Sequence, residues 1–145
     1  MKAGRVQEAD ELFGKWVERE LVSNGTNSPR YADLLYHWGA LLFGADVFDV
    51  AASKLSLCID CRSRLSGQGH PTTLEAMKML SECFRSVGRV QEAVAMYRQV
   101  KTGMESNAAQ AADPADTDHG MSVLLASMSY LELCNNLCAC LHQLQ

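Results

Sequence analysis

The sequence predicts an all-α fold in which antiparallel helical hairpins stack into a solenoid. The hexapeptide Gly-Arg-Val-Gln-Glu-Ala at residues 4–9 recurs identically at residues 88–93, which is 84 residues further on. Ala51 lies midway between the alanines that end these two copies, in a degenerate copy at residues 46–51, so the repeating unit is 42 residues long. A fixed period of this length indicates stacked supersecondary units, each burying its apolar face on its neighbours.

The second helix of each hairpin is predicted by a small residue that is followed four positions later by a large apolar one. Two such positions lie on one face of a helix, one turn apart. The small residue lets a neighbouring helix approach closely, and the large one fills the space beside it. The pairs in this pattern are Ala9 and Phe13, Ala51 and Leu55, and Ala93 and Tyr97.

The first helix of each hairpin is predicted 16 residues upstream of the second-helix alanine. Large, large, small and large residues at offsets 0, 3, 4 and 7 form one face of an amphipathic helix that contains a point of close approach. Two copies are complete: Leu35, Trp38, Gly39 and Leu42, then Met77, Leu80, Ser81 and Phe84. A third set follows near the C-terminus: Cys134, Leu137, Cys138 and Leu141.

The helix ends are marked by caps and turn residues. Ser28 is expected to cap a helix that has Pro29 at its first position, where the missing N–H costs nothing. Thr72 and Glu75 have the spacing of a capping box for the next hairpin. Small polar residues, Gly and Pro predict loops at 23–27, 66–69 and 105–118.

These signals divide the chain into one domain, 1–145, and its parts follow in order. We expect a lone second helix at 4–22, full repeats at 28–65 and 71–104, a loop or insertion at 105–118, and one or more C-terminal helices at 119–145. Because the pattern starts and stops on half-repeats, the chain is expected to be an excerpt of a longer array.

The repeat resembles the tetratricopeptide repeat (TPR), whose pattern is W-x2-L-G-x2-Y followed by A-x3-F. The 42-residue period, the segment Gly69-His70-Pro71-Thr72-Thr73-Leu74 and the segment Leu133-x-Asn135-Asn136-Leu137 are similar to the kinesin-light-chain subtype. The resemblance implies a right-handed superhelix whose first helices line a concave groove. It also implies a non-catalytic module that binds a peptide or a partner protein.

Groove positions follow from the first-helix pattern, one and five residues after its leading large residue and on the next turn. They include the small residues Ala40 and Ala139. The Asn136 side chain is expected to hydrogen-bond the main chain of an extended peptide, as in the arrays that this chain resembles. The predicted peptide-binding residues are Tyr36, Phe43, Lys78, Glu82, Arg85, Asn135, Asn136 and His142.

No residue pattern supports catalysis, a metal site or a cofactor. Cys58 and Cys61 have half of a zinc spacing, but no second pair completes the site. Cys134 and Cys138 share a helical face at repeat packing positions, where buried thiols behave as small hydrophobes. The four histidines are scattered, and no nucleophile is paired with a base.

Composition narrows the class of partner. The chain has 13 basic and 17 acidic residues, a net charge of −4 and no basic cluster, so nucleic acid is not expected as a partner. Its apolar runs are far shorter than the ~20 residues that span a bilayer, so no membrane insertion is expected. Six cysteines without a secretory signal predict a reducing, cytoplasmic location. The charged run Glu18-Arg19-Glu20 is expected to be a solvated helix face.

Two other functions compete with the protein-interaction module. The array could self-associate through its half-repeat ends as a homo-oligomer, since the last segment is rich in leucine: Leu131, Leu133, Leu137, Leu141 and Leu144. The chain could instead be a docking or regulatory segment of a larger enzyme. The identity of the partner does not follow from the sequence.

Overall fold

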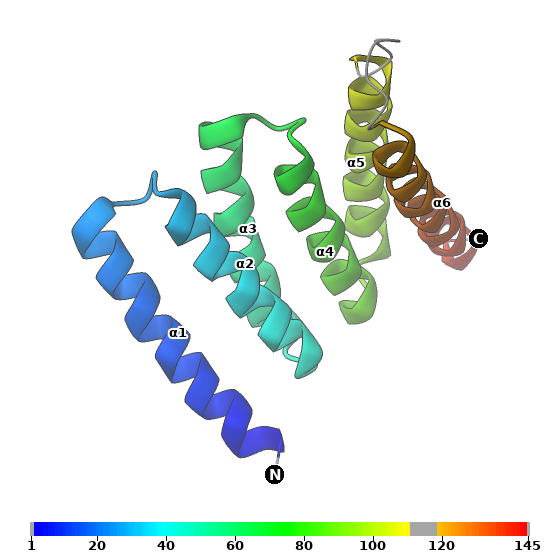
Figure 1. Ribbon diagram of the computed structural model, residues 1–145. Coiled ribbons are helices and arrows are strands. Elements are labelled where there is room, and N and C mark those ends of the chain that lie inside the picture. The colour runs from blue at the N-terminus through cyan, green and yellow to red at the C-terminus, as the bar shows by residue number, and fades with distance from the viewer. Residues whose placement is uncertain (1, 111–118, 145) are drawn as a thin grey trace.

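The computed structural model describes residues 2–110 and 119–144, with side chains at 4–107, 109 and 131–144. All the regular structure in these residues is helical: α1 (Lys2–Asn24), α2 (Pro29–Gly44), α3 (Phe48–Ser66), α4 (Pro71–Val87), α5 (Val90–Gln110) and α6 (His119–Gln143). Figure 1 shows the helices following one another in chain order, with the two termini at opposite ends of the row. The predicted all-α solenoid is confirmed.

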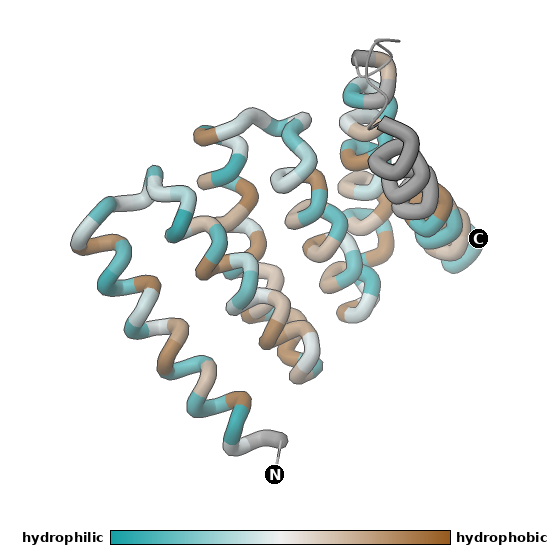
Figure 2. The backbone as a smooth tube through the Cα atoms, viewed as in Figure 1, coloured by the Kyte–Doolittle hydropathy of each residue, from teal (hydrophilic) through white to brown (hydrophobic). Residues whose placement is uncertain are grey.

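Helices pack mainly on their neighbours in the chain. The pairs α2 with α3 and α4 with α5 form hairpins, while α3 contacts α4 and α5 contacts α6 between hairpins. We refer to α2, α4 and α6 as first helices and to α1, α3 and α5 as second helices. Figure 2 shows hydrophobic and hydrophilic residues mixed along the coloured helices, as expected of amphipathic helices. The buried hydrophobic residues form clusters between neighbouring helices.

The repeat positions make up much of the core. Trp38 and Phe84 are half-buried, as are Ala9 and Phe13 on α1. The other predicted positions are buried: Leu35, Gly39, Leu42, Ala51, Leu55, Met77, Leu80, Ser81, Ala93 and Tyr97. The small residues therefore lie where the sequence pattern puts close approaches between helices.

Turns between hairpin helices use the same backbone conformation at equivalent positions. Gly88 ends α4 with a left-handed φ of 87° and donates its N–H to Arg85 and Phe84 carbonyls. Asp46, one period earlier, has φ 62° at the matching turn between α2 and α3. Gly and Asp are residues that adopt this conformation with little strain, which explains Gly88 at the start of the second copy of the hexapeptide.

Helix starts agree with the sequence at α2 and differ at α4. Ser28 caps α2, accepting a hydrogen bond from the Tyr31 N–H, with Pro29 in the first turn. The predicted capping box at Thr72 is wrong, because Thr72 lies inside α4 and His70 is the cap. The His70 Nδ1 accepts the Thr72 N–H at 3.3 Å, which leaves Thr72 within the first turn that Pro71 begins.

Glu20 is not part of a solvated face, as the charged run suggested, but is buried at the α1–α2 turn. The Ser28 hydroxyl donates to its Oε1 at 2.6 Å, and the Asn24 amide donates at 2.9 Å. These hydrogen bonds, with a smaller contribution from Arg30, lower the pKa of Glu20 below its ordinary value of 4.5. Sequence alone did not reveal this, because Ser28 approaches Glu20 only once the chain has turned.

We expect Glu20 to stabilise the fold in a pH-dependent way. A carboxyl with a depressed folded pKa adds stability above its unfolded pKa, and this is lost as the pH falls through the folded value. Urea unfolding should therefore show a stability deficit for Glu20→Gln at pH 7 that shrinks below pH 4.5. The exposed neighbour Glu18→Gln should keep the wild-type profile, and an equal profile for all three proteins would contradict this role.

The C-terminal part departs from the expected boundaries. Helix α5 continues to Gln110, so the start of the predicted 105–118 loop is helical, and residues 111–118 lie outside the described residues. The prediction that Cys134 and Cys138 are packing residues is wrong for Cys138, whose thiol is exposed. Cys134 is half-buried. Among the described α6 side chains, 131–144, the buried ones are Leu133 and Cys140, which lie one position before the expected packing residues Cys134 and Leu141.

Candidate protein-interaction surface

Predicted groove residues on α4 and α6 meet in a polar network. The Lys78 ammonium contacts the Glu132 carboxylate at 2.7 Å, which links the two first helices. One turn further along α4, Glu82 accepts the Asn136 amide at 2.8 Å through Oε1 and the Arg85 guanidinium at 2.8 Å through Oε2. The structure therefore places these side chains side by side on one surface, which we call the first-helix face.

The electrostatics of the network favour its charged forms. Partial burial lowers the pKa of Arg85, but the charge and hydrogen bond of Glu82 outweigh it and raise the pKa above its usual value. The hydrogen bond and charge of Lys78 lower the pKa of Glu132. Beneath them, burial and then Glu82 raise the pKa of the Tyr97 hydroxyl, which keeps it protonated. These shifts favour the charged forms of Arg85 and Glu132 and the neutral form of Tyr97 at neutral pH.

Other predicted groove residues on α6 are exposed. Asn135 and His142 lie on the surface of the helix, and so does the small Ala139 between them. Asn136 is half-buried because its amide donates to Glu82. The amide that was expected to hydrogen-bond a peptide backbone thus already has an intramolecular acceptor, and Asn135 is the more accessible of the two.

On α2 the predicted groove residues take part in packing. Tyr36 is half-buried under the Arg62 guanidinium, which lies 4.7 Å from its ring centre. Burial, with the carboxylate of Glu75 nearby, raises the pKa of Tyr36 to about 12. Phe43 is half-buried against Phe48 of α3, with ring centroids 5.4 Å apart. Both side chains are therefore only partly exposed.

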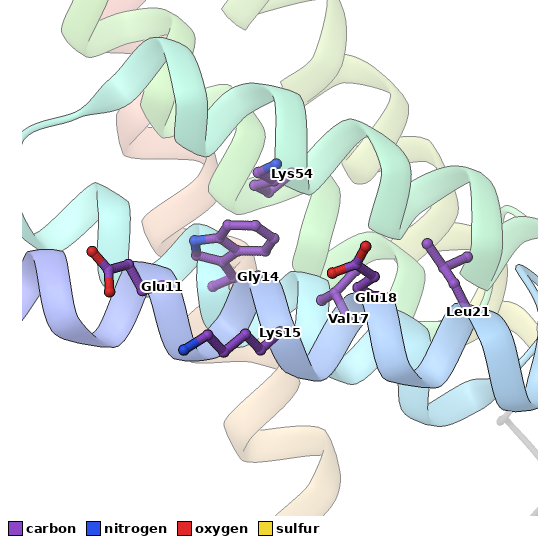
Figure 3. Close-up of a pocket in the computed structure, with 8 residues that line it drawn as sticks. Glu11, Gly14, Lys15, Val17, Glu18, Leu21 and Lys54 are labelled. Carbon is purple, nitrogen blue, oxygen red and sulfur yellow. The ribbon is translucent and has the colours of Figure 1, made fainter.

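A second candidate surface, which the sequence did not indicate, is a pocket of 530 Å³ formed by α1 with Trp38 of α2 and Lys54 of α3. Figure 3 shows Lys54 of α3 facing the α1 residues of this pocket. The Trp38 indole has the Lys54 ammonium 4.0 Å from its ring centre and donates its N–H to Asp10 at 2.6 Å. The lining residues are Glu11, Gly14, Lys15, Val17, Glu18, Leu21, Trp38 and Lys54.

The described residues include buried thiols in the core and no group of metal ligands. Burial raises the pKa of the Cys58 and Cys83 thiols to about 11, so they are poor nucleophiles. Within the described ranges, no three His, Cys, Asp or Glu side chains are grouped so as to hold a metal ion. In the same part of the chain, no helix is both long and apolar enough to cross a membrane.

No protein-family model matches the sequence, and no curated protein matches it. Solved structures do resemble it. The crystal structure of BtubC (BKLC) from P. vanneervenii superposes with a TM-score of 0.66 at 13% identity, and the match covers 97% of this chain and 55% of that one. The chain thus spans about half the length of BtubC.

This chain also superposes, with a TM-score of 0.63, on a crystal structure of a protein from Podosopora anserina. That protein is described as a putative kinesin light chain with nearly identical TPR-like repeats. Its identity is 20%, and the match covers 99% of this chain and 70% of that one; a variant of the same protein gives the same values. At this level of identity the likeness concerns the fold. The chain therefore has the fold of a TPR-like repeat protein, an all-α solenoid similar to that of kinesin-light-chain-like proteins.

Proposed function

We propose that the chain is a non-catalytic scaffold that binds a peptide or partner protein on its first-helix face. The observation that carries this proposal is the polar network of Lys78, Glu82, Arg85 and Asn136, which spans α4 and α6 on one surface. The network aligns fixed charges and amides, with the exposed Asn135 beside them. Preorganised polar groups lose little entropy when a partner binds.

The chemistry of the partner follows from this surface. Basic and acidic groups alternate along α4, so the first-helix face suits a partner of mixed charge rather than a polyanion. Asn135 can both donate to and accept from the main chain of an extended peptide. We propose a protein partner, with neither nucleic acid nor membrane, in a reducing intracellular compartment, consistent with the six unpaired cysteines.

A matched pair of variants tests the surface. Ala139 on α6 and Ala95 on α5 are both exposed alanines within helices, and only Ala139 lies on the first-helix face. In quantitative affinity capture from a cell extract, Ala139→Arg is expected to retain the wild-type partners at least about tenfold less well. This corresponds to a loss of about 1.4 kcal/mol of binding free energy. Ala95→Arg is expected to retain them. Equal retention by both variants, or no specific capture by wild type, would contradict the proposal.

A further inference from the structure

A buried hydroxyl lies beneath the polar network of the first-helix face. Tyr97 of α5 is 0% exposed, and its hydroxyl has no hydrogen-bond partner among the described residues. The ring belongs to the core cluster that also contains Met77 of α4 and Cys140 of α6, so it packs among three helices. Burying a hydroxyl without a hydrogen bond destabilises a fold, and such groups are rare in protein cores. A role for this hydroxyl is therefore worth seeking in its surroundings.

The Glu82 carboxylate is the acceptor beside this hydroxyl. After burial, Glu82 is the main cause that raises the pKa of Tyr97, so the two groups lie close together. Both carboxylate oxygens already have donors: Oε1 accepts the Asn136 amide and Oε2 accepts the Arg85 guanidinium, each at 2.8 Å. Three donors thus surround one carboxylate, and Tyr97 is the one without a hydrogen bond.

The acceptor and two of its donors occur together at one junction of the array. Glu82, Tyr97 and Asn136 lie where the hairpin of α4 and α5 meets α6. The hairpin of α2 and α3 meets α4 in the same repeat register, and its equivalent residues are all apolar: Ala40, Leu55 and Met79. Because Leu55 is also 0% exposed, this core position does not itself need a hydroxyl. The joint appearance of the three polar residues indicates that they act as a set.

We propose that Tyr97 is a reserve donor for Glu82, which replaces the Asn136 amide when a partner on the first-helix face takes that amide. The exchange keeps Oε1 hydrogen-bonded and gives the buried hydroxyl an acceptor, so little free energy is lost when Asn136 leaves. Arg85 stays on Oε2, and no charge is left unpaired. Asn136 can then donate to a carbonyl oxygen of the partner. Tyr97 is thus a positioning residue that does not touch the partner, and its role rests on the proposed function.

A double-mutant cycle tests the exchange without any partner. Asn136→Ala imitates the withdrawal of the amide, and Tyr97→Phe removes only the hydroxyl. Urea unfolding of the wild type, the two single variants and the double variant gives four unfolding equilibrium constants.

The effect of Tyr97→Phe is expected to depend on Asn136. In the wild-type background it should raise the unfolding constant by no more than about threefold, because the hydroxyl has no hydrogen bond to lose. In the Asn136→Ala background it should raise the constant at least about tenfold, because the hydroxyl then donates to a carboxylate. A hydroxyl that only fills space would have the same effect in both backgrounds.

Tyr31→Phe provides the control, since Tyr31 is also buried but belongs to a different core cluster. Its effect should be the same in both backgrounds. Equal effects of Tyr97→Phe in the two backgrounds would overturn the proposal, and so would a tenfold effect in the wild type, where the hydroxyl would already be bonded. A background dependence shared by Tyr31→Phe would also overturn it. Because the cycle contains no partner, its outcome is independent of the Ala139→Arg assay, which tests the proposed function.

Discussion

Replacing Gly39 by alanine is expected to lower the free energy of unfolding by about 2 kcal/mol, although alanine is the better helix former. A Cβ at Gly39 would lie 2.8 Å from Cγ and 3.0 Å from Cδ2 of Leu55. Leu55 is fully buried and its Cγ is a branch point, so the side chain cannot move aside without disturbing the core. The α2–α3 contact would have to open.

The matched control is Gly44→Ala, at the last residue of the same helix, where an added Cβ meets nothing within 4 Å. Urea unfolding should show this variant neutral or stabilised by up to about 1 kcal/mol. Equal stability of the two variants would show that α2 and α3 are not packed as closely as described.

Replacing Arg62 by alanine is expected to cost about 2–3 kcal/mol of unfolding free energy. Arg62 is an almost fully buried charge on α3. It donates to the Thr72 carbonyl of α4 at 2.6 Å and to the Asp33 carboxylate of α2 at 3.2 Å. Its guanidinium also covers the Tyr36 ring. One side chain thus joins three helices.

Thermal and urea unfolding of Arg62→Ala, Arg62→Lys and Arg98→Ala test this role. Lysine keeps the charge but lacks the planar fork, so Arg62→Lys should recover only part of the loss. Arg98 is exposed on α5, and its replacement should change stability by less than about 0.5 kcal/mol. Full recovery of stability with lysine would show that only the charge of Arg62 matters and would contradict a role for its planar guanidinium.

The repeat positions could be predicted from the sequence because a solenoid buries the same positions in each unit. Ala51, Leu55, Ala93 and Tyr97 are all 0% exposed, which follows from the period alone. Prediction was less successful where a residue's partner comes from another part of the chain. Cys138 has the pattern of a packing residue but is exposed, because no second helix covers it in the part of the chain that the structure describes.

The candidate site was predictable as a set of positions but not as a set of contacts. The first-helix register puts Lys78, Glu82 and Arg85 on one side of α4, and their role in binding a peptide stays a prediction. It could not show that the Asn136 amide donates a hydrogen bond to Glu82, which lies 54 residues earlier in the chain. That contact depends on how closely α6 approaches α4. The register also missed the buried Arg62, since a charged residue in the middle of a helix is usually solvated.

Hydrogen–deuterium exchange on a complex with a captured partner tests the central claim most directly. We expect slower exchange in peptides from α4 and α6, where the first-helix face lies, and little change in α3. Peptides of α1 serve as an internal comparison, because they line the 530 Å³ pocket with α3. Protection confined to α1 and α3 would contradict the first-helix face as the binding surface and would assign binding to that pocket.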